Sequence, residues 1–300
     1  NMKKIVLITG ANGMLSKHLA KQLENEYTIR FLTRKVKNEN EFLWDLSNNY
    51  IDPKALKNVQ TIIHLAGSSI AEKKWTKKVK ERIYSSRIDT ANLIFEKLKE
   101  YQIIIDTFIS ASAVGYYGTV TSDTIFDEES KKGNDFLSDV CYKWENAAQN
   151  FKTNNIANRV AIVRIGIILA ENEGALKKIV QPIKYGVGSG IGKGNQYMPW
   201  IHIQDLSNMF QFILNNNQLE GAFNGVSPEH VTNIELTKMI GKKINRPILL
   251  PNIPKFVISA LFGEMGSILL NGSRVSSEKI RDNGFEFQYG KLDEALKDIL

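Results

Sequence analysis

The sequence has 300 residues, of which 43% are hydrophobic and 24% are charged, as in ordinary globular proteins with one large domain or two modest ones. Its single cysteine excludes an internal disulfide, so the composition does not indicate an oxidising compartment. The net charge of +7 would suit a polyanionic partner or substrate.

The first half of the chain alternates predicted strands and helices. Short apolar runs that end in glycine or polar residues indicate strands at 3–9, 27–33, 41–46, 60–67, 106–112 and 159–169. Apolar spacing of three and four indicates helices at 14–24, 77–100 and 136–151. Such alternation predicts an α/β fold, a Rossmann-type doubly wound parallel sheet covered on both faces.

The rhythm changes after about residue 170. Glycines recur between 186 and 194, and three prolines cluster between 247 and 254. We therefore expect a first domain at 1–168 and a smaller α/β lobe at 169–300, partly interleaved with it. The glycine-rich run is either a mobile lid over a bound ligand or a loose loop.

The distribution of charge and apolar residues bears on location and partners. No apolar run reaches the ~20 residues of a membrane-spanning helix, and the opening MKKIVLITG is too short for a secretory signal. We expect a cytoplasmic chain without membrane contact. The basic cluster KKWTKKVKER alternates with apolar residues, which favours a solvated helix face over a nucleic-acid site.

A glycine turn joins the first strand to the first helix. In VLITGANGML, Gly10 permits a tight turn and Gly13 lets backbone approach a pyrophosphate at the helix N-terminus. The third glycine of the usual dinucleotide motif is replaced by Ser16. A glycine turn without a ligand is the alternative. The predicted cofactor contacts here and after the fourth strand are Gly10, Asn12, Gly13, Met14, Leu15, Leu65, Ala66 and Gly67.

The end of the second strand indicates which dinucleotide binds. NAD-binding proteins place an acid there for the ribose diol, whereas this chain has Thr33, Arg34 and Lys35. Since a guanidinium suits a 2′-phosphate, we predict NADP over NAD, unless Arg34 merely decorates a strand end. Asp45, at the end of the third strand, is placed to meet adenine or to cap a turn.

At ISASAVGYYG (109–118) the sequence resembles the extended short-chain dehydrogenase/reductases, the nucleotide-sugar epimerase and dehydratase group. GANGML and HLAG occur in the family's order. AEKKW, DFLSDVCYKWE, GNQYMPWIHIQD and RVSSEKIRDNGFEF resemble an atypical branch that is labelled "epimerase family protein" and is sometimes described as a cell-division inhibitor. The resemblance covers nearly the whole chain.

The resemblance implies a site with a serine, an asparagine and a Tyr-x-x-x-Lys pair. The serine corresponds to Ser112, and Arg87 stands at the asparagine position. The Tyr-Lys pair is missing: its positions hold Leu137 and Cys141 in one alignment, or Cys141 and Glu145 in another. We place Ser112, Tyr116 and Arg87 around the nicotinamide. Aromatic packing is the alternative for Tyr116, and a surface ion pair is the alternative for Arg87.

Cys141 lies in the middle of an apolar stripe of its predicted helix. Glu145 is one turn away, and a neighbouring carboxylate and apolar packing both disfavour the reactive thiolate. We therefore interpret Cys141 as a small buried hydrophobe.

In the second lobe Gln196, Trp200 and His202 are the predicted substrate contacts, with a structural His202 as the alternative. Asp205 is expected to cap the following helix. The absence of a histidine pair or a second cysteine argues against a metal site.

Two functions compete. The leading one is an NADP-dependent oxidoreductase or epimerase-like enzyme that acts on a small polar substrate with a non-standard acid/base. The alternative is a non-catalytic protein that binds NADP(H) as a redox sensor or regulator. The helices at 77–100 and 136–151 would pair in a homodimer, or their apolar stripes serve the internal core alone.

Overall fold

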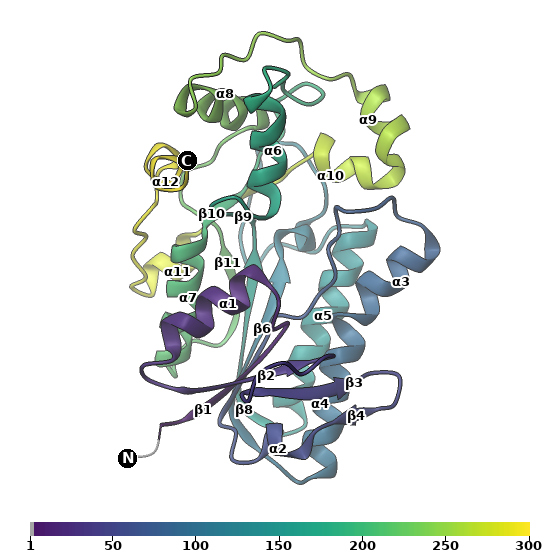
Figure 1. Ribbon diagram of the computed structural model, residues 1–300, viewed down its shortest axis with the longest axis vertical. Helices are drawn as coiled ribbons and strands as arrows, with labels where there is room; N and C mark the ends of the chain where they lie inside the picture. The colour runs from purple at the N-terminus through teal and green to yellow at the C-terminus, as the bar shows by residue number, and fades with distance from the viewer. Residues whose placement is uncertain (1–2) are drawn as a thin grey trace.

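A large parallel sheet forms the centre of the computed structural model, which describes residues 3–300 (Figure 1). The strand order is β11-β8-β6-β5-β1-β2-β3-β4, and only the β3–β4 pair is antiparallel. β1 and β5 are almost wholly buried, because helices cover both faces of the sheet. The strands are β1 Ile5–Thr9, β2 Thr28–Thr33, β3 Glu41–Asp45, β4 Tyr50–Ile51, β5 Thr61–His64, β6 Ile105–Ala113, β8 Ala157–Ile165 and β11 Gly221–Gly225.

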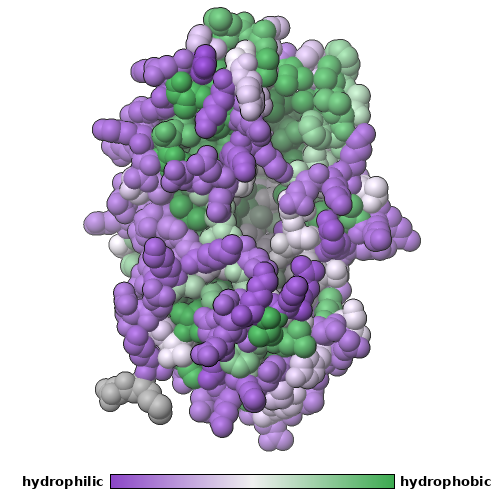
Figure 2. Space-filling model, in the orientation of Figure 1, coloured by the Kyte–Doolittle hydropathy of each residue, from purple (hydrophilic) through white to green (hydrophobic). Residues whose placement is uncertain are grey.

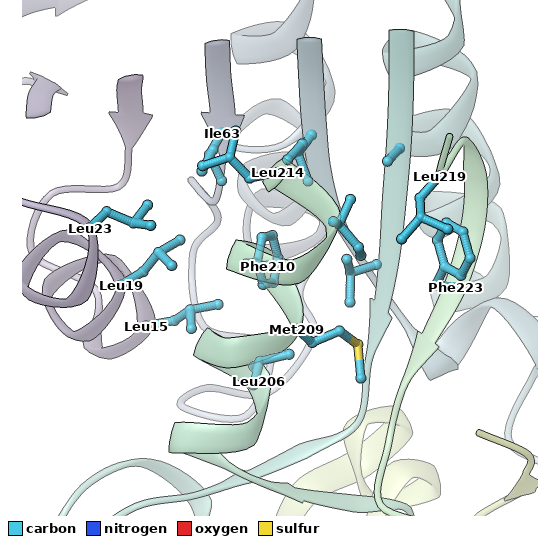
Figure 3. Close-up of a cluster of buried hydrophobic side chains, with 14 of the residues drawn as sticks. Leu15, Leu19, Leu23, Ile63, Leu206, Met209, Phe210, Leu214, Leu219 and Phe223 are labelled. Carbon is cyan, nitrogen blue, oxygen red and sulfur yellow. The ribbon is translucent and has the colours of Figure 1, made fainter. Parts of the chain in front are cut away.

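Helices pack on both faces of this sheet, which confirms the doubly wound fold. On one face α1 (Met14–Leu23) and α7 (Ile203–Asn215) meet over the strands; Figure 3 shows leucines of α1 pointing toward Leu206 and Phe210 of α7. On the other face lie α2 (Pro53–Leu56), α4 (Ile88–Glu100) and α5 (Phe136–Thr153). Alternate residues of β1 serve the two cores: Val6 and Ile8 face α1, and Leu7 faces α4.

A smaller lobe packs above the carboxyl ends of the strands (Figure 1). Its core joins α6, α8 and α12 around the two-stranded sheet β9–β10. α7 and β11 follow residue 169 in sequence but belong to the main sheet layer. The lobe's elements are β9 Ile167–Leu169, α6 Gly174–Lys184, β10 Trp200–His202, α8 Asn233–Lys243, α9 Lys255–Phe262, η2 Gly263–Gly266, α10 Ser267–Leu270 and α12 Leu292–Ile299. α11 (Glu278–Asp282) packs against β11 instead, and its Ile280 joins the core of the main sheet. The short strands β7 (Ile125–Phe126) and β12 (Arg274–Val275) pair with each other, and η1 (Val114–Tyr117) follows β6.

The predicted helix at 77–100 is wrong as one element, because it breaks into α3 (Lys77–Ser85) and α4. The Arg87 N–H donates to Tyr84 O instead of Ile83 O. Ile83 O is taken instead by the Ser86 hydroxyl and the Arg87 guanidinium. Ile88, Ala91 and Leu98 of the predicted stripe are buried inside the chain, which favours the internal-core interpretation over a dimer contact.

The predicted strand at 159–169 also divides. A Cβ at Gly166 would lie 2.6 Å from Pro199 O, so only glycine lets the chain leave β8 there and pair β9 with β10. The remaining predicted strands of the first half and the helices at 14–24 and 136–151 form where expected, with ends that shift by a few residues.

Candidate cofactor and active site

The strand order reverses between β1 and β5, the point where parallel α/β sheets bind ligands. The loop after β1 and the loop after β5 meet there: Gly10 has a φ of +75°, and a Cβ on it would lie 3.2 Å from the Ala66 backbone. Gly13 caps α1 without a side chain, so the first N–H groups of the helix lack a side-chain acceptor. These two loops form a site that suits a pyrophosphate. Figure 2 shows the surface hollowed between the two lobes.

The side chains at the start of α1 point in different directions. The Ser16 hydroxyl donates to Thr9 O at 3.2 Å, so the serine in place of the third glycine ties α1 to β1. Leu15 is buried in the core under α7, which leaves only its backbone for a cofactor (Figure 3). Asn12 is exposed, and Met14 reaches the upper lobe, where its Cε would lie 3.4 Å from a Cβ at Gly174.

Arg34 and Asp45 lie at the ends of neighbouring strands but behave differently. Arg34 follows β2 and is exposed, and no carboxylate of residues 3–300 lies within 4.0 Å of its guanidinium. Asp45 accepts hydrogen bonds from the Ser47 and Asn48 backbone and from the Asn48 side chain. The Asn48 side chain contributes most to holding the pKa of Asp45 below its usual value. Asp45 therefore has the geometry of a turn cap, which was the alternative to an adenine contact.

His64 ties the floor of the site together. Thr9 Oγ1 accepts from the Leu65 and Ala66 N–H groups and donates to His64 Nδ1 at 2.9 Å, so the ring donates through Nε2 to Arg87 O. Burial lowers the pKa of His64 to about 4, and the ring is therefore neutral at pH 7. This network fixes the two cofactor loops and the start of α4 relative to one another.

Arg87 presents an unpaired cation at the same place. Its guanidinium lies against Gly67, where a Cβ would come within 2.9 Å of Cζ, and over the Trp144 ring at 5.1 Å. Burial lowers its pKa to about 10, which leaves it charged at pH 7. No carboxylate among the described residues forms an ion pair with it, so the surface ion pair considered from sequence does not form.

A buried ion pair that the sequence analysis missed controls Ser112. Glu145 of α5 accepts from Arg164 Nε at 2.8 Å and Nη2 at 2.9 Å, and the Ser112 hydroxyl donates to Glu145 Oε1 at 2.8 Å. Burial alone would lower the pKa of Arg164, but the hydrogen bonds and charge of Glu145 outweigh it and raise the pKa. The sequence held two signals for this pair: a glutamate on the apolar face of a predicted helix and an arginine inside an apolar predicted strand. Both positions predict a buried charge, which needs a partner of opposite sign.

The two tyrosines after β6 have separate environments. Tyr117 is buried, donates to Asn224 Oδ1 and accepts from Arg164 Nη1, and burial raises its pKa. Tyr116 is half-buried, and its ring lies 3.5 Å from the Arg164 guanidinium. The Tyr116 hydroxyl has no hydrogen-bond partner among residues 3–300, which leaves one phenol free to act on a ligand.

Cys141 is buried beneath η1, 3.8 Å from the position of a Cβ at Gly115. Burial and then the charge of Glu145 raise its pKa to about 12. The interpretation of Cys141 as a buried hydrophobe is therefore confirmed.

The structure places the predicted substrate contacts of the second lobe in its interior. Trp200 is fully buried and donates to Glu229 O, and Gln196 donates to Ile191 O and Leu269 O, although its Oε1 is buried without a partner. The expected Asp205 cap is wrong: His202 caps α7 by accepting from Gln204 N, while Asp205 accepts from the Gln288 and Tyr289 N–H groups. His202 also donates to Asp298, so its geometry favours the structural alternative.

No group of three or more histidine, cysteine, aspartate or glutamate side chains within residues 3–300 is placed to hold a metal ion. From the loops and the side chains described above, we take the candidate site to consist of the two glycine loops, Arg34, Arg87 and Tyr116.

Comparison with known families fits this geometry. The model of the NAD dependent epimerase/dehydratase family matches residues 6–225, and a domain of unknown function, DUF1731, matches residues 253–299. The chain belongs to the NAD dependent epimerase/dehydratase family. The resemblance inferred from the sequence motifs is confirmed.

Relatives of this epimerase-family chain cover almost its whole length. It is 34% identical over 306 residues to the epimerase family protein SDR39U1 homolog, chloroplastic, of Arabidopsis thaliana, with 98% of this chain and 86% of that protein covered. It is 32% identical over 301 residues to the epimerase family protein YfhF of Bacillus subtilis, with 98% and 97% covered. Because the plant relative is named as chloroplastic, the cytoplasmic location stays a prediction.

The solved structure of human epimerase family protein SDR39U1 with NADPH superposes with a TM-score of 0.88 at 27% identity, and covers 98% of each chain. A nucleoside-diphosphate sugar epimerase from Corynebacterium glutamicum gives a TM-score of 0.80 at 28% identity and covers 99% of this chain and 58% of that one. Within this epimerase family the present chain keeps the cofactor loops but lacks the Tyr-x-x-x-Lys pair.

Proposed function

We propose that this chain binds NADP(H) and acts as an oxidoreductase or epimerase-like enzyme on a small polar substrate, with a non-standard acid/base. The observation that carries the cofactor is Arg34: an exposed guanidinium without a carboxylate partner, at the strand end where an NAD-binding protein has an acid. The NADPH in the human SDR39U1 structure supports the same choice.

The residues that we place beside the nicotinamide support the proposed chemistry. When bound, the cofactor supplies hydride exchange at its nicotinamide. Arg87 offers a charged, desolvated donor beside Gly67 for an anionic group or a developing oxyanion. Of the two tyrosines that follow β6, only Tyr116 has a hydroxyl without a partner in the described residues, so we assign the proton donor to it. Ser112 is a positioning residue here, because its proton is held by Glu145.

Calorimetric titration of the purified chain with NADPH and with NADH tests the cofactor. We expect NADPH to bind at least about tenfold more tightly, since charge-assisted hydrogen bonds to the 2′-phosphate form with only one of the two nucleotides. Equal affinity, or a preference for NADH, would reject the role of Arg34.

A non-catalytic NADP(H) sensor is the second candidate, and one observation favours it. Ser112, Glu145, Arg164 and Tyr117 form a closed buried network in which every polar side chain has a protein partner. Turnover separates the two functions. A panel of carbonyl and sugar-nucleotide substrates that produces steady NADPH oxidation, abolished by Tyr116→Phe, supports the enzyme. Tight NADPH binding without turnover on any substrate supports the sensor.

A further inference from the structure

An apolar crest lies on the outer surface of the upper lobe, away from the cofactor loops. We define the apolar crest as Tyr185, Val187, Leu249, Leu250, Phe256 and Leu261. Leu249 is 83% exposed and Phe256 is 73% exposed, values far above those of a core residue. Figure 2 shows hydrophobic surface along the top and upper right of the molecule, where α9 and the connection before it lie in Figure 1.

The crest is built on an ordered framework. Ile191 pairs with Ile253, and a Cβ at Gly188 would lie 3.0 Å from Ile248 Cδ1, so the segments before and after α8 run together. α9 buries Ile258 against Gly266, which turns Phe256 outward. The apolar side chains are thus held exposed by the fold.

The charges on the segment that carries most of the crest are positive, and the nearest acidic side chains, Glu264 and Asp293, each form an ion pair with a lysine. Residues 242–262 contain three lysines and one arginine and no acidic residue. Asp293 pairs with Lys243, but Lys242, Arg246 and Lys255 are exposed, and no carboxylate within residues 3–300 lies within 4.0 Å of them. Exposed apolar side chains among unpaired cations are the combination that binds anionic bilayer surfaces.

The basic cluster at 73–82 joins the same surface. Lys74 Nζ donates to Ala260 O at 3.2 Å, and Lys80 pairs with Glu264 at 2.7 Å, so the start of α3 abuts the end of α9. Lys73, Lys77 and Lys78 remain exposed beside it. This places a second group of cations at the edge of the crest. A helix face that is merely solvated would not need to lie beside exposed apolar side chains.

We propose that the apolar crest and its flanking cations dock this chain onto the surface of an anionic phospholipid bilayer. No described helix is long and apolar enough to cross a membrane, so the contact is peripheral, with Leu249 and Phe256 inserted at the headgroup level. A second copy of the chain fits the crest less well, because a symmetric contact would bring the flanking cations of both copies, Arg246 and Lys255 among them, into one interface. The proposal revises the expectation of a chain without membrane contact.

Vesicle flotation tests the proposal. The chain should float with vesicles of an equal mixture of phosphatidylcholine and phosphatidylserine, stay unbound with phosphatidylcholine alone, and dissociate as salt screens the charges. Lys255→Gln should lower the partition coefficient by roughly fivefold, and the double variant Leu249→Asp/Phe256→Asp should lower it more than tenfold. Ile104→Asp, at a 63% exposed apolar position between α4 and β6, is the matched control and should float as the wild type does.

Thermal melts of each variant separate lost docking from lost folding, because both changed side chains of the double variant are mostly exposed and should leave the melting temperature unchanged. Wild-type chain that stays unbound with the phosphatidylserine vesicles overturns the proposal. An equal loss of flotation in Ile104→Asp would also overturn it. A third contrary result would be a concentration-dependent dimer that the double variant abolishes, together with wild-type chain that fails to float. None of these readouts depends on nucleotide binding.

Discussion

Glu145 and Arg164 form a bidentate ion pair at the carboxyl end of β8, with side-chain exposures of only 10% and 5%. One of the two alignments places Glu145 itself at the lysine position of the family's Tyr-x-x-x-Lys pair. Glu145 also accepts a hydrogen bond from the Ser112 hydroxyl. The charges of Glu145 and Arg164 thus neutralise each other within the protein.

Removing one partner of this pair should destabilise the fold. Glu145→Gln leaves the Arg164 guanidinium buried without its counter-charge, so we expect a loss of about 3–5 kcal/mol in the free energy of unfolding, measured by urea denaturation. Asp139→Asn breaks the exposed ion pair with Lys143 on the same helix and is the control, with an expected change below about 1 kcal/mol. Equal effects of the two substitutions would contradict the assignment.

Reversing the charge at the end of β2 should reverse the nucleotide preference. Arg34→Asp removes the partner of the 2′-phosphate and supplies an acid for a ribose diol, so we expect NADPH affinity to fall by about tenfold or more while NADH binding improves. Lys99→Asp, an equal charge change at the exposed end of α4, should leave both affinities unchanged. Nucleotide titration of the three proteins measures this.

Gly10 combines a positive φ with a close approach to the loop after β5. Gly10→Ala should weaken nucleotide binding and lower stability by about 1–2 kcal/mol, because alanine disfavours this backbone region and the added Cβ meets Ala66. Gly221→Ala provides a matched control, since Gly221 has a φ of +77° with nothing within 4 Å of its Cβ position. That variant should lose comparable stability and keep full NADPH affinity. Weakened binding in both would show that backbone strain alone is responsible.

His64 should make the fold sensitive to acid. Its pKa is about 4 in the folded chain against an ordinary value of 6.5, so the unfolded state binds the proton more readily. Stability is fully present above pH 6.5 and is lost as pH falls toward 4, by about 3 kcal/mol. His64→Gln should remove this part of the pH dependence in denaturation curves, whereas His18→Gln on α1 should retain it. Parallel acid profiles for wild type and His64→Gln would refute the prediction.

Cys141 should be inert in the folded chain. With a pKa of about 12 and a buried position, its thiolate is almost unpopulated at pH 8. A thiol reagent should therefore modify the single cysteine far more slowly than it does in denaturant. Cys141→Ser should leave nucleotide binding intact. Rapid modification of the native protein would mean that the thiol is reached without unfolding.

The nucleotide fold was predictable because its signals are local. Buried parallel strands appear as continuous apolar runs, and the Gly10–Gly13 turn lies between a strand and a helix that are adjacent in sequence. The site at the β1–β5 edge follows from that alternation alone. The same locality placed Cys141 on an apolar helix face and Arg34 at the end of β2.

Only the tertiary structure decided which polar groups pair at the carboxyl ends of β6 and β8. Glu145 and Arg164 come from a helix and a strand 19 residues apart, and their pairing depends on how α5 lies against β8. The break at Arg87 likewise depends on which side chains take the Ile83 carbonyl. Charges and hydrogen bonds between distant segments leave no periodic trace in a sequence, because they depend on distance in space. Periodicity therefore determined the scaffold, and packing determined which polar groups stay free to act.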